Sequence, residues 1–319
     1  MWNPCDLALE PGTKRQLEIC PNVEGYRIPA TFIAGARPGK SLLITAGTHS
    51  CEYPAIPAVI RLAREIDPGE IRGNVLIVHC VNTSGFRLRT DAFVPEDGGN
   101  LNRDFPGRPD GGCTERIADY FIRKIFPHVD FVADLHSGGI GEALTPCLFF
   151  PYKEGVRERA LAAARSLDIP HLVRTTNGHG IPGWAALSMG IPSLLLERGD
   201  MGQTDPECCE AYFRDMRLLM DHLGILPYAS LPLCEKHVYE EAVYLTAGEE
   251  GLWYPAVRKG QRVRVNDLLG RIEDFWGNAL NEYRAETDGV VLYHTISLSV
   301  NKGMPLVAYG MEGHSSTVA

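Results

Sequence analysis

The sequence predicts an α/β protein, a three-layer α/β/α sandwich with a central, mostly parallel mixed sheet, followed by a small C-terminal all-β domain. Over the first 225 residues or so, short apolar runs alternate with segments of helical periodicity, which is typical of a parallel sheet covered by helices. After about Leu223 the pattern changes to short strands separated by glycine turns. We therefore expect a first domain over residues 1–228 and a second over 229–319.

The elements of the first domain are predicted in order from these two patterns. The apolar runs predict strands over Thr31–Ala34, Leu42–Thr45, Val75–Val81, Val129–Leu135, Cys147–Phe150 and Ser193–Leu196. The helical spacing of apolar residues predicts helices over Pro54–Ile66, Glu115–Ile125, Val156–Leu167 and Pro206–Leu223. Val75–Val81 is an almost continuous apolar run, interrupted only by His79, so we expect this strand to be covered on both faces.

The second domain is predicted to contain strands only. The segment Leu226–Pro232 carries two prolines and is expected to be a linker. Between Glu241 and Gly310, short apolar strands follow glycine-centred turns, and their length and spacing suggest a small β-barrel or sandwich.

Composition limits the function classes. A formal net charge of −9 without a lysine or arginine run argues against nucleic-acid binding. No apolar stretch approaches the roughly 20 residues that span a bilayer, so we expect no membrane insertion. Nine cysteines without a disulfide-framework spacing indicate reduced thiols and a cytoplasmic protein. The sequence is compatible with a homo-oligomer.

Two strand ends carry possible metal ligands. His49 and Glu52 follow the strand at Leu42–Thr45, and His136 follows Val129–Leu135. Functional groups of open α/β sheets gather at the carboxyl ends of the strands, so we expect the three side chains to meet. Two imidazoles and one carboxylate are the protein ligands of a catalytic zinc site. The alternative for each histidine alone is a structural or surface role.

Three further segments carry polar groups that suit a hydrolase. In GGNLNRDFPG, Asn102 and Arg103 offer an amide and a guanidinium for a carboxylate, or form an ordinary polar loop. Glu197 follows the Ser193–Leu196 strand, where partial burial would raise its pKa and suit a general base; the alternative is a pair with Arg198.

The last of these segments is SGFRLRTD. Arg87 or Arg89 could stabilise an oxyanion. Alternate residues of an extended segment face opposite ways, so only one of the two should face the site.

The order of HSCE, NLNR, DLH and LLLE along the chain resembles the zinc carboxypeptidase superfamily, most closely its succinylglutamate desuccinylase/aspartoacylase branch. The resemblance covers about residues 15–225. It implies one zinc ion held by His49, Glu52 and His136, and hydrolysis of a small N-acyl amino acid. It also implies further site residues: Glu197 as the base that activates water, Asn102 and Arg103 on the substrate carboxylate, and Arg89, or alternatively Arg87, on the scissile carbonyl.

The sequence departs from the family pattern in two places. Ser50, followed by Cys51, replaces the usual glycine after the first ligand, and Arg198 replaces a small or apolar residue after the base. The C-terminal part resembles a lipoyl/biotinyl hammerhead, but its FWGNALNE tip has no lysine, so we expect neither biotin nor lipoate. The alternatives to a deacylase are a zinc carboxypeptidase acting on peptides and a non-catalytic ligand-binding protein on the same scaffold.

Overall fold

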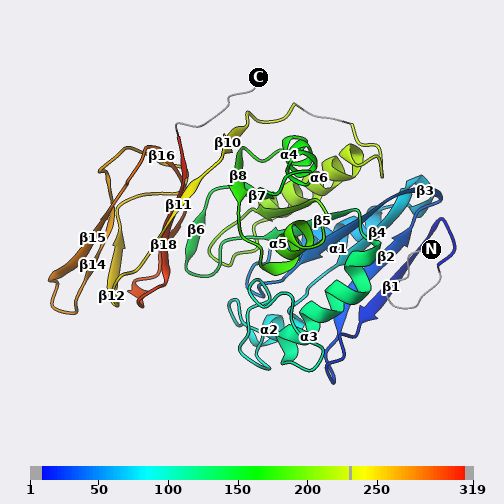
Figure 1. The fold of residues 1–319 in the computed structure, drawn as a ribbon, viewed down its shortest axis with the longest axis horizontal. Coiled ribbons are helices and arrows are strands. Elements are labelled where there is room, and N and C mark those ends of the chain that lie inside the picture. Colours follow the sequence, from blue (N-terminus) through cyan, green and yellow to red (C-terminus); the bar gives the residue numbers. More distant parts are fainter. Residues whose placement is uncertain (1–8, 230–231, 313–319) are drawn as a thin grey trace.

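The computed structural model describes residues 9–229 and 232–312. Its main feature is a nine-stranded mixed sheet in the order β1-β2-β4-β3-β5-β9-β7-β8-β10 (Figure 1). The strands are β1 (Thr13–Ile19), β2 (Ile28–Ala34), β3 (Arg37–Ala46), β4 (Arg72–Val78), β5 (Phe131–His136), β7 (Cys147–Pro151), β8 (His171–Thr175), β9 (Ser193–Glu197) and β10 (His237–Tyr239). The predicted mixed α/β fold is confirmed.

The centre of this sheet is parallel and almost fully buried. Strand β3 pairs in parallel with β4 and β5, and β5 pairs in parallel with β9. The antiparallel pairs are β1–β2, β2–β4 and β7–β9. All six residues of β5 are buried, as expected for a strand covered on both faces. The carboxyl ends of β3, β5 and β9 therefore lie side by side at one edge.

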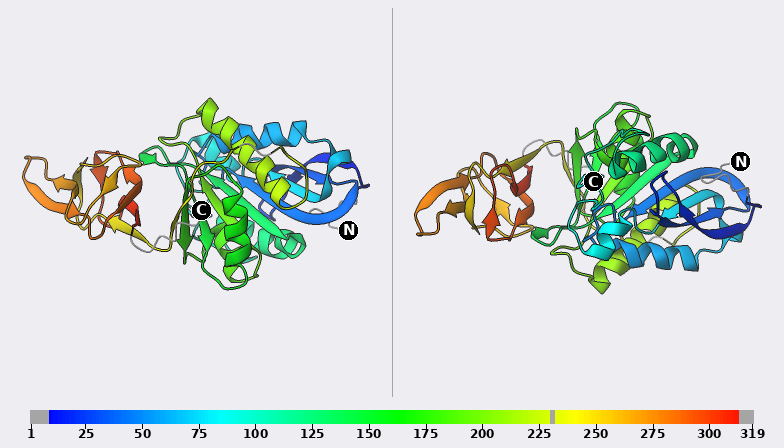
Figure 2. Two further views of the ribbon diagram at one scale, coloured as in Figure 1. Left: turned by 90° about the horizontal axis from the view of Figure 1, so that it is seen from above. Right: turned by 90° about the horizontal axis from the view of Figure 1, so that it is seen from below.

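Helices cover both faces of the sheet (Figure 2). The helices are α1 (Ala55–Glu65), α2 (Thr83–Leu88), α3 (Cys113–Tyr120), α4 (Arg157–Arg165), α5 (Gly180–Leu187) and α6 (Pro206–His222). Apolar residues of α1, α4 and α6 share one core with Leu42, Ile44 and their neighbours on the sheet. Residues of α3 and α5 share a second core with Leu43 and Leu76. Because successive strand residues point to opposite faces, the two cores lie on opposite sides of the sheet.

The C-terminal part consists of short strands, and the described residues after 241 contain no helix. The strands are β11 (Ala242–Thr246), β12 (Gly251–Pro255), β13 (Arg262–Val263), β14 (Leu268–Glu273), β15 (Ala279–Arg284), β16 (Gly289–Thr295), β17 (Ser299–Val300) and β18 (Pro305–Met311). They form two small sheets around a separate core that contains Trp253 and Tyr309.

Among the described residues, two strand pairings join the C-terminal part to the rest. Strand β6 (Glu142–Leu144) belongs to the first part of the chain in sequence, but it pairs antiparallel with β16 of the C-terminal part. Strand β10 pairs with β8 at the edge of the large sheet, although it follows the predicted boundary at residue 228. The predicted linker Leu226–Pro232 falls partly outside the described residues. In the two described ranges, no helix is long and apolar enough to cross a bilayer.

Candidate metal centre

The two ends of neighbouring strands bring His49, Glu52 and His136 together. Strand β3 ends at Ala46, and the turn that follows begins with Gly47 at a φ of 63°. A Cβ on Gly47 would lie 2.8 Å from the sulfur of Cys80, so the close approach of the two segments requires glycine here. His136 is the last residue of β5, directly beside β3. The predicted meeting of the three side chains is confirmed.

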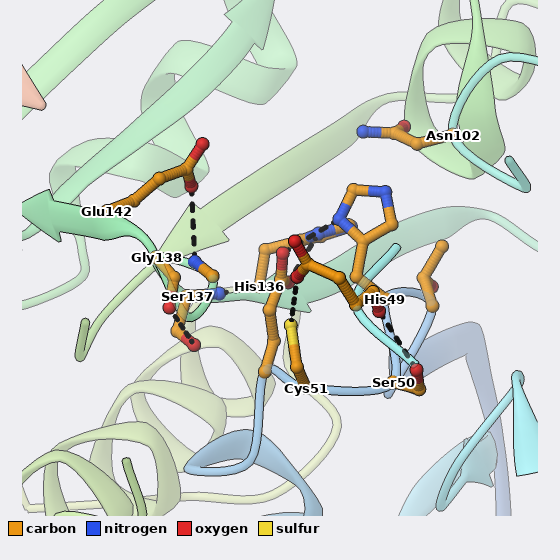
Figure 3. A network of polar contacts seen from close by, with 12 residues as sticks. His49, Ser50, Cys51, Asn102, His136, Ser137, Gly138 and Glu142 are labelled. Carbon is orange, nitrogen blue, oxygen red and sulfur yellow. Dashed lines mark hydrogen bonds and ion pairs between the residues drawn. The ribbon is translucent and has the colours of Figure 1, made fainter. Parts of the chain in front are cut away.

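The three side chains form a compact set of metal-ligand atoms (Figure 3). His49 Nδ1 lies 2.7 Å from Glu52 Oε1, and His136 Nδ1 lies 2.8 Å from Glu52 Oε2. One ligand atom from each residue lies within 4.8 Å of the others. Two imidazole nitrogens and a carboxylate oxygen are the donor set that zinc takes in catalytic sites, so the residues fit a divalent metal.

The far side of each imidazole ring is held by a second residue. His136 Nε2 lies 2.9 Å from Asp134 Oδ2, and His49 Nε2 lies 3.1 Å from Asn100 Oδ1. Asp134 in turn accepts hydrogen bonds from the hydroxyls of Thr45 and Thr48. Metal-binding histidines commonly donate their other ring N–H to a carboxylate or carbonyl, which fixes the tautomer. Both rings therefore direct Nδ1 towards Glu52, where a metal would be held.

The electrostatics of the set favour positive charge between the ligands. Burial by itself would raise the pKa of Glu52, but the two imidazoles outweigh it and lower that pKa to about 2. Burial opposes the charged form of His136, yet the carboxylates of Asp134 and Glu52 raise its pKa well above the usual value. A carboxylate that stays ionised beside two nitrogen ligands is suited to a cation.

Glu197 lies one strand away from the metal ligands. It ends β9, where it is paired in register with His136 on β5. Its Oε2 is buried and has no hydrogen-bond partner among the described residues. Burial raises the pKa of Glu197 well above its ordinary value, and the charge of Glu52 adds to that rise. A carboxyl group in this setting is suited to accept a proton near neutral pH.

Arg198 does not accompany Glu197 into the site. Its Nε lies 2.6 Å from Asp215 Oδ2 on α6, and both side chains are buried. A second guanidinium nitrogen donates to the main-chain oxygen of Asp168 over 2.7 Å. Adjacent residues of a strand point to opposite faces, so the cation and the carboxylate are separated by the sheet. The alternative pairing of Glu197 with Arg198 is therefore wrong.

Asn102 and Arg103 lie at the rim of the same region. Asn102 is 8% exposed, and its Oδ1 has no hydrogen-bond partner among the described residues. Arg103 is exposed, donates to the main-chain oxygen of Asn102 over 2.8 Å, and forms no ion pair with a described carboxylate. In Figure 3, Asn102 lies on the opposite side of the two imidazoles from Glu142.

Arg87 and Arg89 lie away from the cavity around the metal ligands. The expected extended segment is wrong, because residues 83–88 form the helix α2, whose start is capped by the side chain of Asn82. Arg89 ends this helix at a φ of 57°. Both arginines are exposed, and Arg89 lines a separate hollow beside Tyr53.

Ser50 and Cys51 fasten the ligand turn to the loop after α2. The hydroxyl of Ser50 lies 2.7 Å from the main-chain oxygen of Thr90 and 2.9 Å from that of Asp91. The thiol of Cys51 lies 2.7 Å from Asp91 Oδ1. Ser50 and Cys51 are both buried, so they act on the turn between the two ligands rather than on the open face of the site.

A cavity of about 680 Å³ opens over the metal ligands. It adjoins a second cavity of about 610 Å³, which shares Asn102, Arg103, Glu197 and Tyr244 with it. The C-terminal part supplies one wall of the first cavity through Tyr244, Leu292, Tyr293, Thr295, Ser297, Ser299, Val300, Met304 and Pro305.

Four further residues line this cavity although no sequence pattern pointed to them: Asp91, Glu142, Tyr244 and Tyr293. Glu142 comes only six residues after His136 in the sequence, and this short separation could have indicated that it lies near the predicted ligands. The positions of the two tyrosines depend on the pairing of the C-terminal strands. No local sequence motif therefore indicates that they line the cavity.

Comparison with known proteins places these residues in a family. Residues 38–223 match the model of the succinylglutamate desuccinylase/aspartoacylase catalytic domain. The chain is 32% identical over 288 residues to an N-alpha-acetyl-L-2,4-diaminobutyric acid deacetylase from Halomonas elongata, covering 86% of this chain and 83% of that protein. It is 26% identical to a succinylglutamate desuccinylase from Pseudomonas aeruginosa, over 59% of this chain and 60% of that protein.

Solved structures agree with this placement. The product-bound ectoine utilization protein EutE (DoeB) from Ruegeria pomeroyi superposes with a TM-score of 0.85 at 26% identity, covering 96% of this chain and 97% of the other. A succinylglutamate desuccinylase/aspartoacylase from Rhodobacter sphaeroides also gives a TM-score of 0.85, at 25% identity, covering 97% and 99%. The similarity therefore extends through the C-terminal β part.

Proposed function

Because this chain belongs to the succinylglutamate desuccinylase/aspartoacylase family, we propose that it hydrolyses the amide bond of a small N-acyl amino acid with the help of one zinc ion. Relatives named as a deacetylase and a desuccinylase support an amidohydrolase acting on such amides. The observation that carries the proposal is the meeting of His49, Glu52 and His136 beside the unpartnered carboxylate of Glu197.

Each polar group around the cavity has a role in this proposal. Zinc held by His49, Glu52 and His136 would supply a Lewis acid and lower the pKa of the attacking water. Glu197 takes the proton from that water and passes it to the leaving amine.

Asn102 and Arg103 bind the carboxylate of the substrate and so orient the scissile amide. The assignment of Arg89, or alternatively Arg87, to the scissile carbonyl stays a prediction, since α2 would have to move to bring either side chain into the cavity.

The wall formed by the C-terminal part favours a deacylase over a carboxypeptidase. Tyr244, Tyr293 and Pro305 line the cavity on the side of the C-terminal part, so a substrate bound there is bordered by that part. A small N-acyl amino acid fits within a cavity of about 680 Å³, whereas a peptide needs an open groove.

The experiment is a screen of the zinc-loaded protein against N-acetyl and N-succinyl amino acids beside a panel of peptides. We expect turnover of one or more N-acyl amino acids, no turnover of peptides, and about one zinc per chain by elemental analysis. Preferential cleavage of peptides would favour the carboxypeptidase. Absence of zinc together with absence of all turnover would favour the non-catalytic binding protein.

Several features around this function are also proposals. The two cores on opposite faces of the sheet support a three-layer α/β/α sandwich for the catalytic part. The separate core of the C-terminal strands supports two domains, 1–228 and 229–319, with β10 returning to the large sheet. A cytoplasmic location, the lack of nucleic-acid partners and a possible homo-oligomer remain predictions from composition.

A further inference from the structure

A buried tyrosine hydroxyl lies beneath the strand ends that carry the metal ligand and the base. Tyr212 extends from α6 and is fully buried. The single hydrogen of its hydroxyl is shared between two acceptors, the main-chain oxygen of His136 and, at 3.1 Å from the hydroxyl oxygen, the main-chain oxygen of Leu196. The first of these oxygens belongs to a metal ligand, and the second belongs to the residue before Glu197.

The hydroxyl therefore connects two functional groups that come from different strands. His136 and Glu197 are opposite each other in the parallel pairing of β5 and β9. At this point the ladder includes a hydrogen bond from the N–H of Arg198 to the oxygen of His136 over 3.2 Å. Just beyond it, the N–H of Gly138 donates to the oxygen of Gly199 over 3.0 Å. Tyr212 adds a side-chain link from α6 to these main-chain links.

Helix α6 is itself fixed beneath the sheet, which makes the link rigid. Asp215 lies about one turn after Tyr212 and is paired with Arg198. Asp215 Oδ1 also accepts a hydrogen bond from the main-chain N–H of Asp168 over 3.1 Å. Leu196 and Arg198, the residues on either side of Glu197, are thus both held by α6.

Packing alone does not require a hydroxyl at position 212. Tyr212 lies in an apolar core with Phe213, Met216 and Leu219 of the same helix, where a phenylalanine ring would pack equally well. Burial raises the pKa of Tyr212, so its hydroxyl stays protonated and remains a donor. Phenylalanine at this position would leave the oxygen of His136 with the ladder hydrogen bond only.

We propose that Tyr212 is a positioning residue, which fixes the base Glu197 relative to the metal ligand His136 by joining the two strand ends beneath them. This inference rests on the proposed hydrolase function. A displacement of about 1 Å in a catalytic group can cost about 100-fold in rate. Loss of the hydroxyl should therefore affect kcat and metal affinity, whereas KM depends on Asn102 and Arg103 in another loop.

The test compares Tyr212→Phe with the matched variant Tyr26→Phe. Tyr26 is also a buried tyrosine whose hydroxyl donates to a main-chain oxygen, that of Val81 over 3.1 Å, but it touches no metal ligand. We expect Tyr212→Phe to lower kcat by at least about tenfold with KM within about twofold of wild type. We expect its zinc dissociation constant, from competition with a chromogenic chelator, to rise about tenfold. Tyr26→Phe should change none of the three.

Equal kcat and equal zinc affinity in the two variants would overturn the positioning role. Incorporation of p-aminophenylalanine at position 212 restores an N–H donor, so kcat and zinc affinity should return towards wild type; values as low as those of the phenylalanine variant would also overturn it. If wild-type protein hydrolysed no N-acyl amino acid, the proposed function would fail, and the zinc affinities of the variants would still decide the role of Tyr212.

Discussion

The carboxylate of Glu197 should destabilise the metal-free protein, and Glu197→Gln should therefore stabilise the fold while it abolishes turnover. Burial and nearby carboxylates raise the pKa of Glu197, and its Oε2 has no hydrogen-bond partner among the described residues. A carboxyl group whose pKa is higher in the folded state than in the unfolded state does not destabilise the fold at pH values below its unfolded-state pKa. The destabilisation grows as the pH rises from the unfolded-state pKa to the folded-state pKa. Glutamine keeps the shape and removes this destabilisation.

The size of both effects follows from the environment of the side chain. A buried polar group without a partner costs about 1–3 kcal/mol and a charged group costs more, so replacing the ionised carboxylate by a neutral amide should stabilise the metal-free variant by about 1–3 kcal/mol at mildly alkaline pH. At about 2–4 °C per kcal/mol, this gain raises Tm by roughly 2–12 °C. The lost proton transfer should lower kcat by about 100- to 10,000-fold. Bound zinc offsets the negative charge, so the stability gain should shrink in the zinc-loaded protein.

Thermal unfolding with chelator and with zinc, together with kcat on the best N-acyl substrate, measures these effects. Glu197→Asp is the matched control, because it keeps the charge but withdraws the carboxylate by one methylene. We expect the aspartate variant to lose activity without a gain in stability. A glutamine variant no more stable than the aspartate variant, or one that retains wild-type kcat, would refute the assignment of Glu197 as a buried, unpaired base.

Four further predictions concern other parts of the molecule. Chelation should abolish activity and lower Tm, and zinc at about 100 times its dissociation constant should restore about 2.7 kcal/mol of stability. Arg103→Lys should raise KM about tenfold or more with little change in kcat, because lysine cannot bind a carboxylate through two N–H groups; an unchanged KM would remove the carboxylate role. Burial, with the nearby His237, lowers the pKa of His171 to about 4. The neutral ring therefore contributes its full stability to the fold above about pH 6.5, and this contribution is lost as the pH falls towards 4. His171→Gln should reduce the change in the free energy of unfolding over this pH range, measured in urea, by up to about 3 kcal/mol. Asp215→Ala should cost about 3–5 kcal/mol by leaving Arg198 buried alone, whereas the double replacement Arg198→Met with Asp215→Leu should cost much less by denaturant unfolding.

The meeting of His49, Glu52 and His136 could be predicted because it depends on local patterns. Apolar runs define the ends of β3, β5 and β9, and parallel strands bring those ends to one edge. Helix α5 could not be predicted, since GIPGWAAL contains two glycines and a proline, which disfavour a helix. It forms because Ile181 and Ala185 pack against the sheet. Helix α2 has only six residues, and its signal in the sequence is the local N-cap Asn82, which accepts a hydrogen bond from the N–H of Gly85.

The division between chemistry and specificity follows the division of the chain. The match to the family's catalytic domain, residues 38–223, includes all metal ligands and Glu197. Tyr244 and Tyr293 lie outside it, yet both line the cavity, and the pairing of β6 with β16 places Tyr293 opposite Leu144. Relatives can therefore share the ligand set and the base while they differ in the C-terminal wall. Replacing Tyr244 and Tyr293 by other side chains should then change which N-acyl amino acid the protein prefers and leave its zinc affinity unchanged.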